Sequence, residues 1–206
     1  MSVCTSHPVP FNDVAEELES HDEETTQGGR AVQAGKVSEN AVESVFKTLR
    51  YRKYTYKEWV MADRPQHSCL VTHYPYPKWY GRQGYSEFVV YPHPGAAVGP
   101  NPVRVEARWQ SVSGSADEKM PNLLNHAYYH YPEETVVLVI DGPGFHTELI
   151  DQVEDSIEWF NNQRKNAAPG RQRDGFGLQV PDIPDTKRVE RVDMGGWLEW
   201  AKENLS

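Results

Sequence analysis

The sequence is poor in cysteine and has no long hydrophobic run. Two cysteines occur among 206 residues, which excludes a zinc site built from four cysteines and argues against a disulfide framework. No apolar run approaches the roughly 20 residues that a membrane-spanning helix needs. The first ten residues contain neither the basic region nor the apolar stretch of a secretory signal. We therefore expect a protein of a reducing compartment that has no membrane partner.

Positive charge is missing from the start of the chain. Residues 1–29 contain seven acidic residues and no Lys or Arg, which leaves residues 30–206 with 23 acidic against 21 basic residues. This composition predicts an acidic, disordered tail over 1–29 and one domain over 30–206. The tail either only solvates the protein or competes with nucleic acid for a basic surface. The nearly neutral domain is compatible with phosphate binding, especially beside a divalent metal.

Hydrophobic periodicity predicts an α/β domain. Apolar residues at helical spacing predict helices over 31–50, 116–130, 147–164 and 196–205. Alternating or continuous apolar runs predict strands over 51–60, 86–91, 103–110, 135–140 and 187–192. Segments 61–78 and 166–185 are expected to be long loops. Pro121 either kinks its helix or begins it. Because that helix connects strands 103–110 and 135–140, these two strands should be parallel.

The strand over 103–110 carries the first candidate site. Glu106 and Arg108 are two residues apart, so their side chains should project from one face. Glu87 lies on the preceding strand, which we expect to be the hairpin partner of this one. Two carboxylates from neighbouring strands can converge on Mg²⁺, and a nearby cation can stabilise charge that develops on phosphorus. A cross-strand ion pair on an exposed face is the alternative interpretation.

Longer motifs surround these residues. The stretch VEARWQSVSGSADEKMP, residues 105–121, resembles the core motif of the PD-(D/E)XK nuclease superfamily, and the likeness continues in VLVIDGPGF at 137–145. The segment YGRQGYSEFV at 80–89 looks like the one that carries the family's first metal-binding Asp. The segment GKVSENAV at 35–42 looks like the family's N-terminal helix, and WLEW at 197–200 resembles its closing helix.

The resemblance implies a restriction-endonuclease-like fold, in which helices flank a mixed central sheet. It also implies Mg²⁺ or Mn²⁺ as cofactor and DNA as the partner whose phosphodiester bonds are hydrolysed. Glu87 and Glu106 would be the metal ligands, and Arg108 the cation at the scissile phosphate. Glu39 would be an outer ligand or would position water, with Glu43, one helical turn further on, as the alternative.

The site departs from the family motif at two positions. Glu87 stands where the family has Asp, which keeps the charge and lengthens the side chain by one methylene. Arg108 stands where the family has Lys, and an arginine stays protonated and cannot act as a base. Lys119 in the next helix is an alternative source of a titratable amine. Gln110 is expected to help orient water or substrate.

Other segments carry weaker signals. The segment 50–57 interleaves bases with aromatic residues, which is typical of nucleic-acid surfaces and equally of an edge strand protected by charge. The residues expected to contact nucleic acid are Arg50, Arg52, Lys53, Lys57, Arg82 and Lys119. His126 and His130 have the spacing of metal ligands, but a packed aromatic helix is favoured. Asp141 is interpreted as turn chemistry.

The favoured function is therefore a divalent-metal-dependent DNA endonuclease, cytoplasmic and encoded by a bacterial host or a phage. One alternative is a catalytically degenerate protein of the same fold that binds nucleic acid or a protein partner. Another is a structural component of a larger assembly, such as a phage particle. A homodimer or a larger assembly is compatible with each of these functions.

Overall fold

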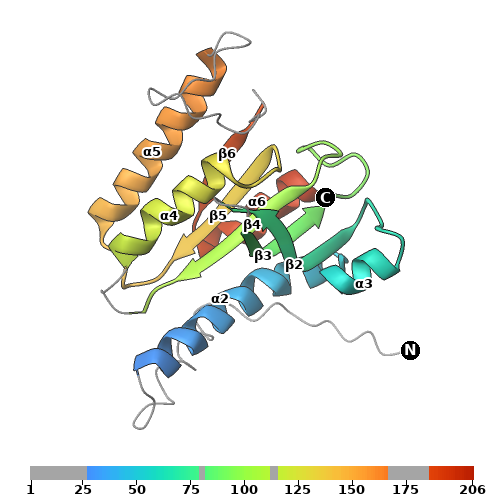
Figure 1. The fold of residues 1–206 in the computed structure, drawn as a ribbon, viewed down its shortest axis with the longest axis horizontal. Helices are drawn as coiled ribbons and strands as arrows, with labels where there is room; N and C mark the ends of the chain where they lie inside the picture. Colours follow the sequence, from blue (N-terminus) through green and yellow to red (C-terminus); the bar gives the residue numbers. More distant parts are fainter. Residues whose placement is uncertain (1–26, 79–81, 112–115, 167–185) are drawn as a thin grey trace.

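A six-stranded mixed sheet lies at the centre of the molecule, between helices (Figure 1). The computed structural model describes residues 27–78, 82–111, 116–166 and 186–206. The strands are β1 Arg52–Thr55, β2 Cys69–Pro77, β3 Gln83–Tyr91, β4 Val103–Trp109, β5 Thr135–Asp141 and β6 Arg188–Val192. The helices are α2 Gln27–Thr48, α3 Tyr56–Met61, α4 Ala116–Tyr129, α5 Thr147–Asn166 and α6 Met194–Leu205. Nearly all of the predicted tail and of the predicted loop 166–185 lies outside the described residues.

The strands lie side by side in chain order, from β1 to β6. The pairs β2–β3 and β3–β4 are antiparallel, whereas β1–β2, β4–β5 and β5–β6 are parallel. The parallel pairing of β4 with β5, through α4, confirms the predicted βαβ unit. The mixed sheet with flanking helices also confirms the predicted α/β fold class.

The helices cover the two faces of the sheet (Figure 1). Helices α2 and α6 pack on the face to which β4 contributes Val105 and Ala107. Helices α4 and α5 pack on the opposite face, against Leu138 and Ile140 of β5. Short helix α3 closes a separate cluster over β1, β2 and β3. Within the described part of the chain, no helix is both long and apolar enough to cross a membrane.

The prediction of one strand over residues 51–60 is wrong. Strand β1 ends at Thr55, and α3 begins at the next residue. Thr55 Oγ1 accepts a hydrogen bond from the Glu58 backbone N–H (3.3 Å), and Glu58 Oε2 accepts one from the Thr55 N–H (2.8 Å). This reciprocal capping box starts a helix, and it outweighs the alternating pattern because the turn also buries Trp59.

The prediction of a long loop over 61–78 is also wrong, because β2 occupies Cys69–Pro77. Pro75 and Pro77 disfavour a strand in the middle of a sheet, since proline cannot donate to the ladder. However, β1 pairs with β2 only from Cys69 to Thr72. Beyond Thr72, β2 is an edge strand with β3 as its one neighbour, and there proline is tolerated.

Helix α4 is continuous from Ala116 to Tyr129 with Pro121 inside it, so the alternative start at Pro121 is wrong. Proline removes one intrahelical hydrogen bond, here close to the beginning of the helix. Packing of the following residues offsets this cost, because Leu123, Ala127 and Tyr128 are buried. Helix α4 therefore keeps its position over the face of β4 that carries Arg104 and Glu106.

Candidate active site

The candidate site lies where strands β3 and β4 diverge. Strand β3 pairs with β4 only over Phe88–Val90, although it continues to pair with β2 as far as Gln83. Glu87 immediately precedes Phe88 in β3 and does not pair with β4 through its backbone. Its carboxylate extends toward β4 and contacts that strand through its side chain. Its Oε2 accepts a hydrogen bond from the Ala107 backbone N–H (2.6 Å). This bond lies beyond the last backbone pair between β3 and β4. The Glu87 side chain therefore lies between the two strands where the sheet opens.

Arg108 connects the two acidic residues of the site. Its Nη1 donates to Glu87 Oε1, and its Nη2 donates to Glu106 Oε2 at 3.2 Å. Nη1 also donates to the carbonyl oxygen of Ala107 at 2.6 Å. Three oxygens, two of them anionic, thus surround one cationic group. The structure brings together the three residues that the motif predicts, with Glu87 and Glu106 on either side of Arg108.

Burial sets the electrostatics of this group. The side chains of Glu87 and Glu106 are 19% and 2% exposed, and that of Arg108 is 37% exposed. Burial raises the pKa of Glu87 to about 7, against the opposing charge of Arg108. Burial also raises the pKa of Glu106, which Arg108 and Arg104 oppose. Burial lowers the pKa of Arg108, but the two carboxylates raise it above its ordinary value. Arg108 therefore stays protonated and cannot serve as a base.

Helix α2 contributes a third acidic residue that acts electrostatically on this group. The charge of Glu39 is one of the causes that raise the pKa of Glu87, which places Glu39 within electrostatic range. Glu43, one turn further on, instead forms ion pairs with Lys53 (2.5 Å) and Lys47 (3.4 Å). Of the two glutamates that the sequence suggested, Glu39 contributes to the raised pKa of Glu87, whereas Glu43 is held by two lysines.

A buried network that sequence reasoning missed supports Glu106. Arg104 forms a two-pronged ion pair with Glu133, through Nε (2.6 Å) and Nη2 (2.7 Å), and its side chain is fully buried. Its guanidinium carbon lies 4.4 Å from the ring centre of Tyr131. The hydroxyl of Tyr131 hydrogen-bonds to Glu106 and lowers its pKa. The sequence contained one indication of this network. The alternation of β4 places Arg104 on the same face as Glu106.

Neutralising Glu133 should destabilise the domain strongly. Glu133→Gln removes the carboxylate that forms the two-pronged ion pair with the buried guanidinium of Arg104, and breaking a buried pair in this way typically costs about 3–5 kcal/mol. Urea denaturation measures the change in the free energy of unfolding. Glu154→Gln is the matched control, because Glu154 is 53% exposed in its ion pair with Arg191 and should cost about 1 kcal/mol or less. Equal effects of the two substitutions would contradict this role of the buried pair.

The end of β4 is fixed by the turn that follows β5. Gln110 donates its backbone N–H to the carbonyl of Asp141 (3.2 Å) and accepts from the N–H of Gly144 (2.8 Å). The carboxylate of Asp141 accepts hydrogen bonds from the backbone N–H groups of Gly142 (2.6 Å) and Met194 (3.1 Å). Asp141 therefore shapes this turn and holds the start of α6, as the turn interpretation predicts. The catalytic role of Gln110 stays a prediction.

The structure divides the predicted nucleic-acid contacts into two groups. Arg50, Arg52, Lys53 and Lys57 lie before, on or just after β1, which β2 and β3 separate from β4. They are not beside the acidic pair, and Lys53 is already paired with Glu43. Arg82 is exposed next to the start of β3, and Lys119 is exposed on α4. These last two are the predicted bases on elements that border the site.

The two histidines of α4 belong to an aromatic cluster. His126 Nδ1 lies 3.2 Å from the hydroxyl of Tyr76. The centre of the His126 ring lies 5.3 Å from the centre of the His130 ring. Burial lowers the pKa of His126 to about 4. In the part of the chain that the structure describes, no three His, Cys, Asp or Glu side chains are grouped to hold a metal ion. The contacts of His126 with Tyr76 and His130 agree with the interpretation of a packed aromatic helix.

Comparison with known proteins gives one match. A family model described as a PD-(D/E)XK nuclease superfamily domain matches residues 30–179. The matched segment includes Glu39, Glu87, Glu106, Arg108 and Gln110. No curated protein and no solved structure matches the chain.

Proposed function

Because the chain belongs to the PD-(D/E)XK nuclease superfamily, we propose that it is a divalent-metal-dependent DNA endonuclease that hydrolyses phosphodiester bonds. The convergence of Glu87 and Glu106 on one cationic group, where β3 leaves β4, carries this proposal. A second observation supports it. Glu106 Oε1 is buried and accepts no hydrogen bond from the described residues. This carboxylate oxygen is therefore available to coordinate a metal ion.

The residues of the site fit a hard divalent cation. The oxygens around Arg108 come from Glu87, Glu106 and the Ala107 carbonyl. Mg²⁺ prefers oxygen ligands and is commonly held by one or two carboxylates together with waters, so a third acidic ligand is not required. Glu87 and Glu106 would hold Mg²⁺ or Mn²⁺. The bound ion would supply Lewis-acid polarisation of the phosphate and a water of lowered pKa.

The other side chains have roles that need no proton transfer from arginine. The guanidinium of Arg108 presents two nitrogens to the phosphate oxygens and stabilises the negative charge of the transition state. Glu39 positions water on the α2 side of Glu87, and Gln110 orients water or substrate at the end of β4. Arg82 and Lys119 contact phosphates near the cleaved bond, and Arg50, Arg52 and Lys57 contact phosphates further away. Lys53 joins them only if it leaves Glu43.

Metal removal tests this function directly. Supercoiled plasmid should be nicked by the full-length chain in Mg²⁺ or Mn²⁺, and excess EDTA should stop the reaction. Adding Mg²⁺ beyond the EDTA concentration should restore the rate, because the cation belongs to the reaction and not to the folded core. Agarose gel electrophoresis over time gives the rate. Nicking that persists unchanged in EDTA would contradict metal dependence and point to a different chemistry or to a contaminant.

One observation favours a second candidate function, a degenerate nuclease fold that only binds DNA. Arg108 occupies the family's Lys position, is held by both carboxylates and has a raised pKa. If the family residue must lose a proton, this site cannot perform the reaction. The binding protein would then retain DNA in EDTA and cleave nothing with any metal. If the protein neither binds nor cleaves DNA, the remaining candidate function is that of a structural component in a larger assembly.

A further inference from the structure

The β2–β3 hairpin continues beyond the last residue pair that β3 forms with β4. From Gln83 to Glu87, β3 has β2 on one side and no pairing with β4 on the other. We call residues 74–77 and 83–86 the hairpin arm. The backbone of β2 enters the arm through His73, whose φ of 54° lies in the left-handed region. Glu87 stands at the base of the arm, so the arm borders the candidate active site.

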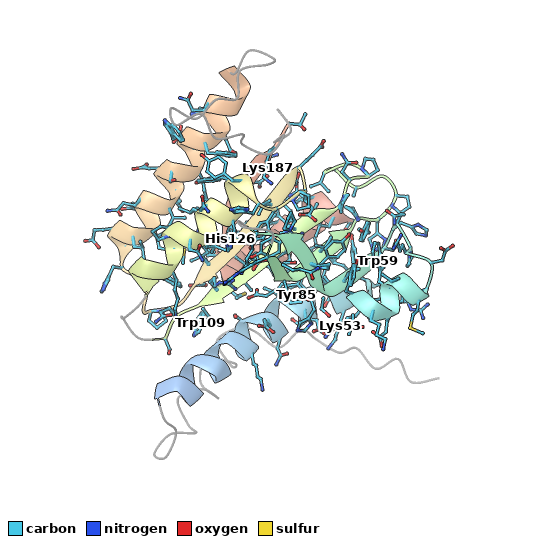
Figure 2. All side chains as sticks on the ribbon, in the orientation of Figure 1. Lys53, Trp59, Tyr85, Trp109, His126 and Lys187 are labelled. Atoms are coloured by element: carbon cyan, nitrogen blue, oxygen red, sulfur yellow. The ribbon has the colours of Figure 1, made fainter. Side chains whose placement is uncertain are left out.

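The arm presents one exposed aromatic side chain, that of Tyr85. It is 62% exposed, and its hydroxyl donates a hydrogen bond to the Gln83 amide oxygen at 3.4 Å. The neighbouring Gly84 faces the other side of the arm, because a Cβ placed there would stand 2.4 Å from the ring of Tyr76. Strand alternation therefore turns Tyr85 away from Tyr76, and in Figure 2 it lies toward α2. Tyr85 lies two positions before Glu87 in the strand, about 7 Å along the chain.

Two cations stand at the end of the same arm. The Lys78 N–H donates to the Arg82 carbonyl at 2.7 Å, which keeps these residues together. Both are exposed, and neither forms an ion pair with a carboxylate among the residues that the structure describes. Arg104, Arg108, Arg188 and Arg191, by contrast, are all paired. The side chain of Lys78 lies over the ring of Tyr76, with Nζ 5.7 Å from the ring centre, on the face from which Tyr85 points away. Arg82 is therefore the exposed cation that remains near Tyr85. An exposed cation and an exposed ring form a combination that binds single-stranded nucleic acid, since the cation contacts the backbone and the ring stacks on a base.

We propose that Tyr85 stacks on an unpaired base, and that the protein binds DNA containing single-stranded nucleotides at this arm. In a continuous duplex the faces of each base are covered by neighbouring base pairs, so the exposed ring would find no surface on which to stack. Arg82 contacts a phosphate of the same strand. The inference rests on the proposed function only in that the bound strand would lead to Glu87 and Glu106; binding itself requires no cleavage.

The test measures binding without cleavage. The dissociation constants of the full-length chain for a fluorescein-labelled single-stranded oligonucleotide and for its duplex are measured by anisotropy, in EDTA at low salt. Tyr85→Leu should weaken single-strand binding about 5- to 150-fold, the range expected when one base–aromatic stack is lost. It should leave duplex binding unchanged. Tyr85→Phe keeps the ring and should bind as the wild type does. Trp159→Leu is the matched control, because Trp159 is 59% exposed on α5, away from the arm.

Three results would overturn the inference: wild-type affinity in Tyr85→Leu, an equal loss for single strand and duplex, or an equal loss in Trp159→Leu. The same measurements distinguish a wrong stacking site from a wrong nuclease function. A chain that shows the Tyr85 effect but nicks no plasmid with Mg²⁺ or Mn²⁺ keeps the stacking site and loses the nuclease activity. A chain that nicks plasmid and shows no Tyr85 effect keeps the activity and loses the stacking site.

Discussion

Glu106→Gln is expected to abolish metal-dependent plasmid nicking. Glutamine has the shape of glutamate but lacks the charge, and a divalent cation held by two carboxylates would lose one of them. Glu106 is also the more buried of the two, at 2% exposure of its side chain, so water cannot easily take the place of the missing ligand. The initial nicking rate is measured over a range of Mg²⁺ concentrations, because a weakened site could partly recover at high metal.

Stability separates this catalytic loss from misfolding. The arginines beside Glu106 each keep another partner, since Arg104 retains Glu133 and Arg108 retains Glu87. Burial also raises the pKa of Glu106, so the charged carboxylate is costly where it stands. Glu106→Gln should therefore unfold in urea at or above the wild-type midpoint, whereas alanine would leave a cavity. Cleavage that survives in a well-folded Glu106→Gln variant would show that the chemistry lies elsewhere.

Arg108→Ala should lower the nicking rate about 100- to 1000-fold, the usual effect of removing one donor that stabilises transition-state charge. The reason lies in the contacts of the guanidinium, whose two terminal nitrogens reach different carboxylates and which is 37% exposed toward a substrate. Single-turnover rates at saturating DNA separate this effect from weaker binding. Arg82→Ala serves as the control for a cation that contacts only the backbone, and it should weaken affinity more than rate.

Arg108→Lys is the informative variant, because it restores the residue of the family motif. We expect a rate between those of the wild type and Arg108→Ala. One ammonium cannot reproduce a fork whose Nη1 and Nη2 contact Glu87 and Glu106 separately. A rate above wild type would instead identify the natural chain as a weakened nuclease that lacks a titratable amine. If both forms are inert with every metal and DNA substrate, the DNA-binding function replaces the nuclease.

The sequence by itself determined the central part of the fold and which side chains of β4 share the face of the candidate site. Alternation in β4 separates Val105 and Ala107 from Glu106 and Arg108, because successive strand residues face opposite sides. The continuous apolar run of β5 identifies a strand buried on both faces, and the intervening helix makes it parallel to β4. These features depend on neighbours in the chain. The family resemblance was likewise readable, since it rests on contiguous motifs.

Tertiary structure alone decided the features that depend on residues far apart in the chain. Strand β2 forms despite Pro75 and Pro77 because β1 ends its pairing at Thr72 and leaves an edge where proline costs no hydrogen bond. Arg104 meets Glu133 across 29 residues of sequence, and no local pattern encodes that distance. The exposure of Tyr85 likewise lies outside any local pattern, since it belongs to the part of β3 that leaves β4 beyond the Phe88–Val105 pair. Periodicity shows which way a side chain points, whereas only packing shows what it meets there.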